Sequence, residues 1–292
     1  MQLLDGKSRA SAIVAQLQQA TKRLHDSAIQ PKLVVITVGE DPASQVYVRQ
    51  KQNRALEIGF AFEWVTLPVE TTQSTLNERI QQYNVEAQTH GLIVQLPLPA
   101  HLDPKQTTMQ IAPEKDVDGF HPLTMGQVVE NQSVLYPCTP KGVLDLLDQA
   151  QIELAGQDVV MVGASQIVGL PLSIMLIHRG ATVTTCHSKT KNLARHTKEA
   201  DIVIVATGCA HLIGPDHLKD GAVVVDVGIN RLPNGKLTGD VDFEAVKDKV
   251  SYMTPVPGGV GPMTVAILMW QTFECCCRQN GLDPQLYLGA TV

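Results

Sequence analysis

The chain has 292 residues and a mass of 31.7 kDa, enough for one large domain or two of ordinary size. Hydrophobic residues make up 44% of it and charged residues 18%, which excludes intrinsic disorder as the dominant state. A net charge of −6 provides no basic field for a nucleic acid or an anionic membrane. We therefore expect neither a nucleic-acid partner nor a membrane partner.

The lack of a recognisable targeting segment and the spacing of the cysteines favour the cytoplasm. The most apolar stretch, 163–177, is interrupted by polar residues and is shorter than the roughly 20 residues that span a bilayer. The amino terminus lacks the cationic and apolar segments of a signal peptide. Of the six cysteines, three are isolated and three are consecutive in a helical pattern, so they do not converge on one metal. We expect a cytoplasmic protein with unbridged thiols and no metal.

Short β-branched runs alternate with longer amphipathic ones in the first half, a pattern typical of βαβ units around a parallel sheet. It predicts helices at 7–25, 43–58 and 73–88 and strands at 33–39, 62–68 and 91–98. An irregular, proline-containing passage follows at 113–142. This passage is the candidate boundary between two domains.

The second half shows the same alternation. It predicts helices at 141–149 and 263–279 and strands at 158–163, 181–187, 201–207 and 222–228. Helices are expected after the first two of these strands, and an Asn-Gly dipeptide within 233–236 predicts a tight turn. The sequence thus predicts an α/β fold of two α/β lobes around a cleft, the second a Rossmann-type doubly wound parallel sheet.

A candidate dinucleotide site begins at Gly163, which follows an all-apolar strand and opens a helix. The segment from Gly163 to Gly169 departs from G-x-G-x-x-G, so its spacing alone does not distinguish such a site from an ordinary strand-to-helix turn. The next strand ends in the polar segment 187–191, without the carboxylate that holds an NAD ribose. Its hydroxyls and cations favour NADP over NAD, although a polar helix entry has the same composition.

A second group of polar residues lies in the first half. Ser44, Tyr47 and Lys51 share one face of the second predicted helix, a pattern that alone is typical of a solvent-exposed surface. Gln95 ends a buried-type strand and so places an amide at the carboxyl edge of the sheet, where ligands bind in open α/β folds. Asp118 lies in an irregular loop, where both functional groups and simple turns occur.

Seven short segments extend these observations along almost the whole chain. They are YVRQK (47–51), GLIVQLPLP (91–99), PEKDVDGF (113–120), PCTP (137–140), DVGIN (226–230), GDV (239–241) and TPVPGGVGPMT (254–264). Together they closely resemble the bifunctional methylenetetrahydrofolate dehydrogenase/cyclohydrolase family, and the last is very specific. The resemblance favours a functional interpretation of the polar residues in the first half.

The resemblance implies a cytoplasmic homodimer that acts on tetrahydrofolate derivatives. Each subunit would have a folate-binding catalytic domain at 1–139 and an NADP-binding Rossmann domain at 140–269, with the carboxyl-terminal helix, 270–292, packed back on the first domain. The reactions would be oxidation of 5,10-methylenetetrahydrofolate to the methenyl cation by NADP and hydrolysis to 10-formyltetrahydrofolate. No formate ligation is expected.

The resemblance also implies roles for individual residues. Lys51, supported by Gln95, would serve the hydrolytic step, and Tyr47, also in the catalytic set, would stack on the aminobenzoyl ring of the folate. Ser44 would contact the substrate, and Asp118 would form hydrogen bonds with the pterin. The cofactor would contact Gly163, Ala164, Ser165, Ser188 and Ile229.

One departure from the family concerns Ala164, which replaces an arginine that contacts the 2′-phosphate in many members. Because no carboxylate in 187–191 favours NAD, NADP remains the expected cofactor.

Two other functions stay open. One is a different NAD(P)-dependent oxidoreductase, since Tyr47-x-x-x-Lys51 resembles the catalytic pair of short-chain dehydrogenases; there, however, the glycine motif precedes the pair. The other is a non-catalytic nucleotide-sensing protein on the same fold, against which the presence of Lys51, Gln95 and Asp118 argues.

Overall fold

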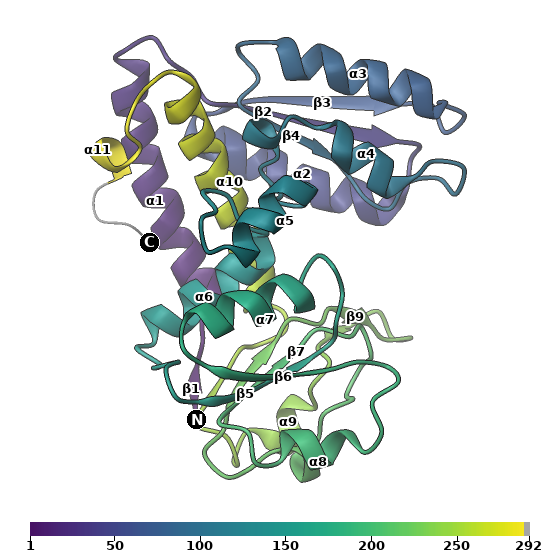
Figure 1. The fold of residues 1–292 in the computed structure, drawn as a ribbon, viewed down its shortest axis with the longest axis vertical. Helices are drawn as coiled ribbons and strands as arrows, with labels where there is room; N and C mark the ends of the chain where they lie inside the picture. The colour runs from purple at the N-terminus through teal and green to yellow at the C-terminus, as the bar shows by residue number, and fades with distance from the viewer. Residues whose placement is uncertain (289–292) are drawn as a thin grey trace. The chain divides into compact units, whose positions relative to one another are not determined.

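The computed structural model describes residues 1–288. The chain divides into two compact units, which we name by their sheets. The three-stranded unit comprises 11–126, 133–138 and the described residues from 265 onward, and the six-stranded unit comprises 1–10, 127–132 and 139–264. Each unit combines a parallel sheet with helices, which confirms the predicted α/β class (Figure 1).

The sheet of the three-stranded unit has the order β3-β2-β4 with parallel pairing throughout. Its elements are β2 (Lys32–Val38), α2 (Pro42–Ile58), β3 (Ala61–Leu67), α3 (Gln73–Val85) and β4 (Gly91–Val94). After β2, the chain forms β3 on one side of β2 and then crosses over to form β4 on the other side of β2. The carboxyl ends of β2 and β4 therefore flank a switch point, where ligands bind in open α/β sheets.

Burial explains why β2 forms the centre of this sheet. Six successive apolar or threonine residues after Lys32 are buried, as expected for a parallel strand that is covered on both faces. On one face, Val34 and Ile36 pack against Leu76 and Ile80 of α3. β4 ends at Val94, earlier than predicted, because the following proline-containing segment leaves the ladder.

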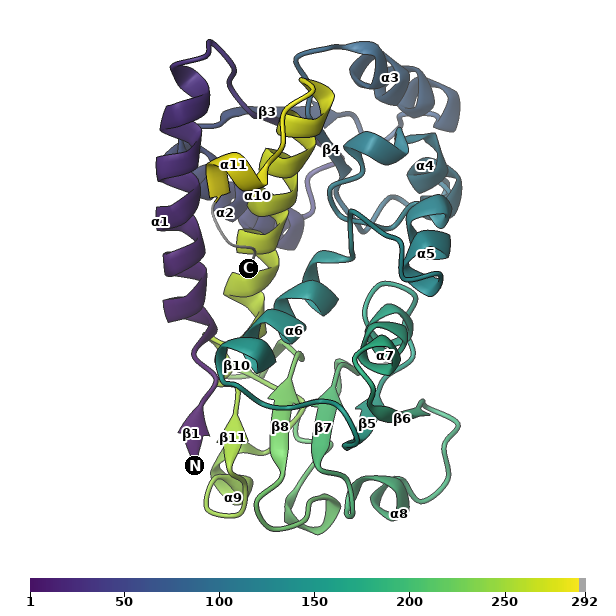
Figure 2. The same cartoon turned by 60° about the vertical axis from the view of Figure 1, so that its left-hand side comes forward.

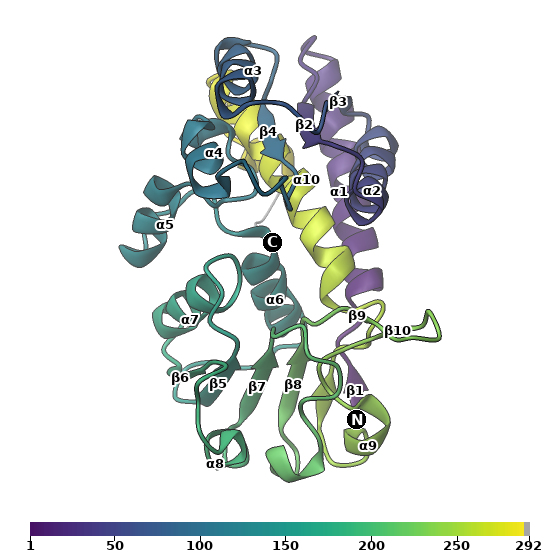
Figure 3. The ribbon, with the colours of Figure 1, turned by 90° about the vertical axis from the view of Figure 1, so that its right-hand side faces the viewer.

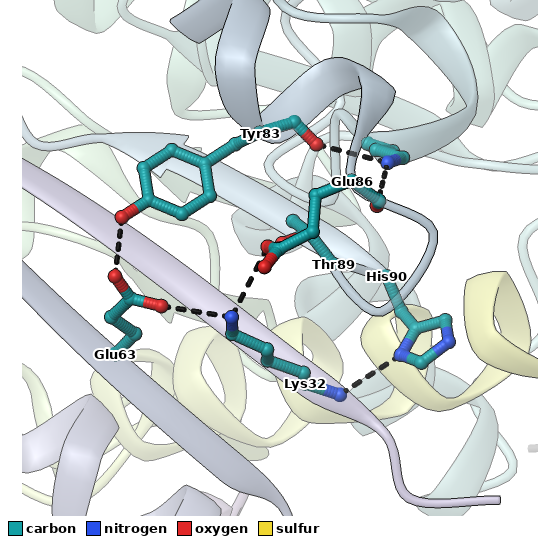
Figure 4. A network of polar contacts seen from close by, with 7 residues as sticks. Lys32, Glu63, Tyr83, Glu86, Thr89 and His90 are labelled. Carbon is teal, nitrogen blue, oxygen red and sulfur yellow. Dashed lines mark hydrogen bonds and ion pairs between the residues drawn. The ribbon is translucent and has the colours of Figure 1, made fainter. Parts of the chain in front are cut away.

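A polar network closes the opposite, amino-terminal end of this sheet (Figure 4). The Nζ atom of Lys32 contacts the carboxylates of Glu63 at 2.8 Å and Glu86 at 3.1 Å. The buried Lys115 donates hydrogen bonds from Nζ to the backbone carbonyls of Tyr83 at 2.9 Å and Glu86 at 2.7 Å. These carbonyls belong to the end of α3, where cations stabilise unpaired carbonyl groups. Both lysines thus anchor α3 at the end of the sheet that lies away from the switch point.

Three further helices contribute to the three-stranded unit (Figures 1 and 2). They are α4 (Pro104–Gln110), α10 (Val260–Gln279), which begins in the other unit, and α11 (Gln285–Leu288). α1 (Gly6–His25) also enters this unit, and its residues Gln16 and Arg23 donate hydrogen bonds to backbone carbonyls of α11. The chain therefore returns to this unit after it has formed the six-stranded sheet.

The six-stranded unit contains the Rossmann-type sheet that the sequence predicted, with the order β1-β11-β8-β7-β5-β6 and parallel pairing. Its strands are β5 (Asp158–Val162), β6 (Thr182–Cys186), β7 (Ile202–Val205), β8 (Val223–Asp226), β11 (Tyr252–Met253) and β1 (Gln2–Leu3). β1 was not predicted, because two exposed residues carry no periodic pattern. The order reverses between β5 and β7, which places a second switch point there.

Helices cover both faces of this sheet. α6 (Cys138–Gln149) and α7 (Gly169–His178) lie on one side, while α8 (Leu193–Thr197) and α9 (Phe243–Val246) lie on the other (Figures 1 and 3). On the second side, the helices and the sheet bury an apolar cluster, in which Leu193 and Phe243 pack against valines of β5, β7 and β8. The predicted turn at 233–236 joins β9 (Asn230–Arg231) to β10 (Leu237–Thr238), which pair antiparallel. Among residues 1–288, no helix is long and apolar enough to span a membrane.

Candidate functional site

A lysine and a glutamine meet at the switch point of the three-stranded unit. The Nζ atom of Lys51, on α2, donates a hydrogen bond to Oε1 of Gln95 at 3.0 Å. The backbone N–H of Gln95 donates to the carbonyl of Ile36 at 2.8 Å, which fixes this residue directly after β4. Its Nε2 atom donates to the carbonyl of Leu96 at 2.8 Å, so the amide presents its oxygen to the lysine. The pair is thus held by the sheet on one side and by a helix on the other.

A pocket lies beside Gln95 at the carboxyl ends of β2 and β4. It is lined by Thr37, Val38, Gly39, Asp41, Ser44, Gln45, Trp64, Thr66, Gln95 and Pro97. Asp41 accepts a hydrogen bond from the backbone N–H of Ser44 at 2.7 Å and so caps the start of α2. The buried hydroxyl of Ser44 has no hydrogen-bond partner within the described part of the chain. Because an unpaired buried hydroxyl is costly, Ser44 is a candidate contact for a bound ligand.

Like Lys51, two other predicted residues lie outside the lining of this pocket. Tyr47 is exposed on α2, one turn before Lys51. Asp118 is half-buried in the loop after the 3-10 helix Pro113–Lys115. This loop meets β4 through a parallel bridge between Asp116 and Leu92. The structure therefore brings Lys51 and Gln95 into direct contact and places Ser44 in the adjoining pocket, while Tyr47 and Asp118 stand apart from it.

Asp116 is a buried carboxylate that the sequence did not single out. Burial raises its pKa to about 7, and the neighbouring charge of Asp118 acts in the same direction. Its carboxylate accepts the backbone N–H of His121 at 2.6 Å, so it shapes the loop that carries Asp118. The signal in the sequence was the repeated aspartate in the segment DVDG, of which only the second aspartate, Asp118, is partly accessible.

The glycine turn of the six-stranded unit lies at the other switch point. Gly163 follows β5 with φ of +120°, and a Cβ atom there would lie 2.2 Å from the carbonyl oxygen of Ala206, after β7. A Cβ atom at Gly169, the first residue of α7, would lie 1.9 Å from the carbonyl oxygen of Gly163. Only glycine fits both positions, because any side chain would collide with backbone. A turn of this tightness, followed by a helix, fits the pyrophosphate of a dinucleotide.

The other residues proposed for the cofactor surround this turn. Ser165 is exposed, and its Oγ accepts the backbone N–H groups of Val168 at 3.2 Å and Gly169 at 3.4 Å. Ala164 is half-buried, and Ser188 is exposed in the turn after β6. These positions would accept a phosphate-bearing ligand without removing a packed side chain.

Ile229 lies further along the same edge of the sheet. It follows β8 and is exposed, and a Cβ atom at Gly261 would lie 3.5 Å from its Cδ1 atom. An exposed aliphatic side chain beside a glycine provides an apolar surface for a planar ring.

Two buried aspartates support the loops of this unit. Asp240 accepts backbone N–H groups of Thr207 at 2.6 Å and Gly208 at 3.0 Å, and Nδ2 of Asn230 at 2.8 Å. Asp226 accepts the backbone N–H of Asp240 at 3.0 Å, and burial raises its pKa to about 6. The two carboxylates thus join the loops that follow β7 and β8. Reasoning from residue types missed both, although the segments DVGIN and GDV contain them.

The described residues contain no group of three or more His, Cys, Asp or Glu side chains that could hold a metal ion. The six cysteines, all in the described part of the chain, form no disulfide, and all but Cys209 are buried. Burial raises the pKa of the thiols of Cys276 and Cys277 to about 12, so these groups stay protonated at neutral pH.

Two family models match the chain. "Tetrahydrofolate dehydrogenase/cyclohydrolase, catalytic domain" matches residues 4–118, and "Tetrahydrofolate dehydrogenase/cyclohydrolase, NAD(P)-binding domain" matches residues 137–280. The chain is 50% identical over 272 residues to the "Bifunctional protein FolD" of Exiguobacterium sibiricum, covering 93% of this chain and 98% of that protein. It is 47% identical over 276 residues to the protein of the same name from Bacillus subtilis, covering 94% and 98%.

Solved structures of tetrahydrofolate dehydrogenase/cyclohydrolases are also similar to this chain. The bifunctional FolD methylenetetrahydrofolate dehydrogenase/cyclohydrolase of Campylobacter jejuni superposes with a TM-score of 0.95 at 46% identity, covering 97% of this chain and 100% of that chain. The Trypanosoma brucei enzyme, solved with NADP and an inhibitor, gives a TM-score of 0.90 at 37% identity, covering 94% and 96%. The chain is thus similar in sequence and in fold to these proteins over nearly its whole length.

Proposed function

Because the chain belongs to the tetrahydrofolate dehydrogenase/cyclohydrolase family, we propose that it oxidises 5,10-methylenetetrahydrofolate with NADP and hydrolyses the methenyl product to 10-formyltetrahydrofolate. The observation that carries this proposal is the hydrogen bond between Lys51 and Gln95 at the switch point. It places a positioned amine where ligands bind in open α/β sheets. The substrates are tetrahydrofolate derivatives, bound in the three-stranded unit.

Hydrolysis of the methenyl cation requires proton transfers while water attacks the carbon. Lys51 supplies a group that can exchange these protons, and Gln95 holds its Nζ atom without adding a charge. The hydroxyl of Ser44 contacts the substrate from the pocket wall, and the ring of Tyr47 stacks on the aminobenzoyl group. Asp118 accepts hydrogen bonds from the pterin. The roles of these residues are proposals that rest on their positions and on the family.

Oxidation requires a nucleotide in the six-stranded unit. Gly163, Ala164 and Ser165 would hold its pyrophosphate, Ser188 its 2′-phosphate, and Ile229 would contact the nicotinamide ring. NADP, when bound, accepts the hydride that leaves the methylene carbon. The glycine turn supports this assignment, as does the NADP complex of the Trypanosoma brucei relative.

The proposal includes a cytoplasmic homodimer. β3 pairs only with β2 within the described residues, so one side of it has backbone groups without ladder partners. Such an edge can pair with a strand of a second copy of the chain. Sedimentation of the purified chain would give the mass of one or of two subunits.

The direct test adds 5,10-methylenetetrahydrofolate to the purified chain with NADP or with NAD. We expect absorbance of NADPH to rise while methenyl absorbance stays low, because hydrolysis removes that product. A folded chain that binds NADP without turnover would instead support the nucleotide-sensing alternative. Turnover with NAD alone would contradict the assignment of the 2′-phosphate site.

A further inference from the structure

Gln271 joins two loops of the three-stranded unit from a fully buried position on α10. Its Nε2 atom donates to the backbone carbonyls of Val117 at 2.8 Å and Tyr136 at 2.9 Å. Its Oε1 atom accepts the backbone N–H of Tyr136 at 2.8 Å. Both amide hydrogens and the amide oxygen are therefore used. Val117 and Tyr136 lie outside helices and strands, so this side chain supplies the pairing that a sheet would otherwise provide.

The two loops also meet by close backbone contact. Gly119 has φ of +75°, and a Cβ atom there would lie 2.4 Å from the carbonyl carbon of Tyr136. The Sγ atom of Cys138 donates to the carbonyl of Val117 at 3.1 Å. Asp118 thus lies between one residue bound by Gln271 and one residue packed on Tyr136. Although it is a loop residue, its backbone is fixed on both sides.

We propose that Gln271 is a positioning residue that sets the place of the Asp118 carboxylate and thereby determines the affinity for the pterin of a folate. This inference rests on the proposed function of Asp118. Removing the amide would break its three hydrogen bonds to the backbone of Val117 and Tyr136 in a buried place, and the loop would have to move to restore the lost pairing. The residues proposed for NADP lie in the other unit, so this change separates folate affinity from nucleotide affinity.

The test replaces Gln271 with methionine, which has a similar length but cannot form the three hydrogen bonds. We expect the KM for methylenetetrahydrofolate to rise about tenfold or more, with kcat less affected and the KM for NADP unchanged. Gln271→Asn, which keeps the amide but is one methylene shorter, gives a second and milder variant. Thr272→Val is the matched control, because Thr272 is also fully buried on α10 but donates only within the helix, to Leu268 at 2.8 Å. The control should leave the folate KM unchanged.

A double-mutant cycle with Asp118→Asn separates positioning from general destabilisation. If Gln271 acts through Asp118, Gln271→Met in that background raises the folate KM less than about twofold further. Independent, multiplicative losses would overturn the proposal, as would an equal rise in the KM for NADP.

Hydrogen exchange of the backbone amides of 117–121 gives a readout that needs no folate. We expect faster exchange in Gln271→Met than in Thr272→Val, and equal rates in the two variants would overturn the proposal. If Asp118→Asn alone leaves folate affinity unchanged, the proposed role of Asp118 fails. The exchange measurement then still decides whether Gln271 holds the loop.

Discussion

The Nζ atom of Lys51 and the Oε1 atom of Gln95, which are 44 residues apart in the chain, lie 3.0 Å from each other. Lys51 lies on a helix and Gln95 directly follows a strand, so their contact depends on how α2 packs beside β4. The partner of the amine is a neutral amide rather than a carboxylate. The contact therefore positions the amine without adding a negative charge beside it.

Lys51→Met should separate the two activities. Hydride leaves the methylene carbon directly for the nicotinamide, so oxidation needs orientation more than a general base. Hydrolysis needs proton transfer and should fall about a hundredfold or more, with methenyl product accumulating. Arg54→Met is the control, since Arg54 lies on the next turn of α2 and pairs with Glu57 at the surface. Equal losses of both activities in Lys51→Met would mean that the lysine only positions the folate.

Asp118→Asn should weaken folate binding and lower both activities together. The amide presents donors toward the donors of the pterin, and each unpaired polar group costs roughly 1 to 3 kcal/mol. Calorimetric titration with folate and with NADP measures the two affinities separately. NADP binding should persist, and unchanged folate affinity would refute this role of Asp118.

Ala164→Arg should tighten NADP binding. A guanidinium at this half-buried position can form a charge-assisted contact with the 2′-phosphate, worth roughly 1.5 to 3 kcal/mol if well formed. Steady-state KM values for NADP and NAD give the result, and NAD should gain little. Ala164→Met controls for added bulk without charge. An unchanged KM for NADP in Ala164→Arg would show that this edge does not bind the 2′-phosphate.

His90 should make the chain less stable in acid. Burial lowers its pKa to about 4, and the charges of Lys115 and Lys32 act in the same direction. The unfolded histidine titrates near 6.5, so the unfolded chain binds the proton first as the pH falls. The free energy of unfolding should therefore decrease between pH 6.5 and 4, by up to about 3 kcal/mol from this group, with no further loss below that range.

His90→Asn provides the comparison for this pH dependence. Nδ1 of His90 accepts the backbone N–H of Lys32 at 3.1 Å, and the asparagine oxygen can accept the same bond without titrating. Urea unfolding at several pH values should show a shallower loss of stability in the variant. Parallel curves for the two proteins would exclude His90 as the source.

The sequence determined the parts of this protein that follow from local patterns. Apolar runs and amphipathic periodicity predicted most strands and helices to within a few residues, as the bounds of β2, α2 and β5 show. The glycine after β5 marked its turn, because only glycine permits such close backbone approach. Seven segments identified the family, which the comparisons confirmed. Each signal lies within a short stretch of chain and is decided by the neighbours of each residue.

Contacts between residues far apart in the chain follow from the tertiary structure. It joined Gln271 to the loop of Asp118, and it showed Asp116 as a buried support of that loop. It also supplied the geometry of the contact between Lys51 and Gln95, which the family resemblance had implied without a distance. It also added β1 to the six-stranded sheet, although two residues carry no periodicity. Such contacts depend on sheet order and on the packing of helices against strands. Sheet order and helix packing depend on burial summed over the whole chain, so they cannot be predicted from any single segment.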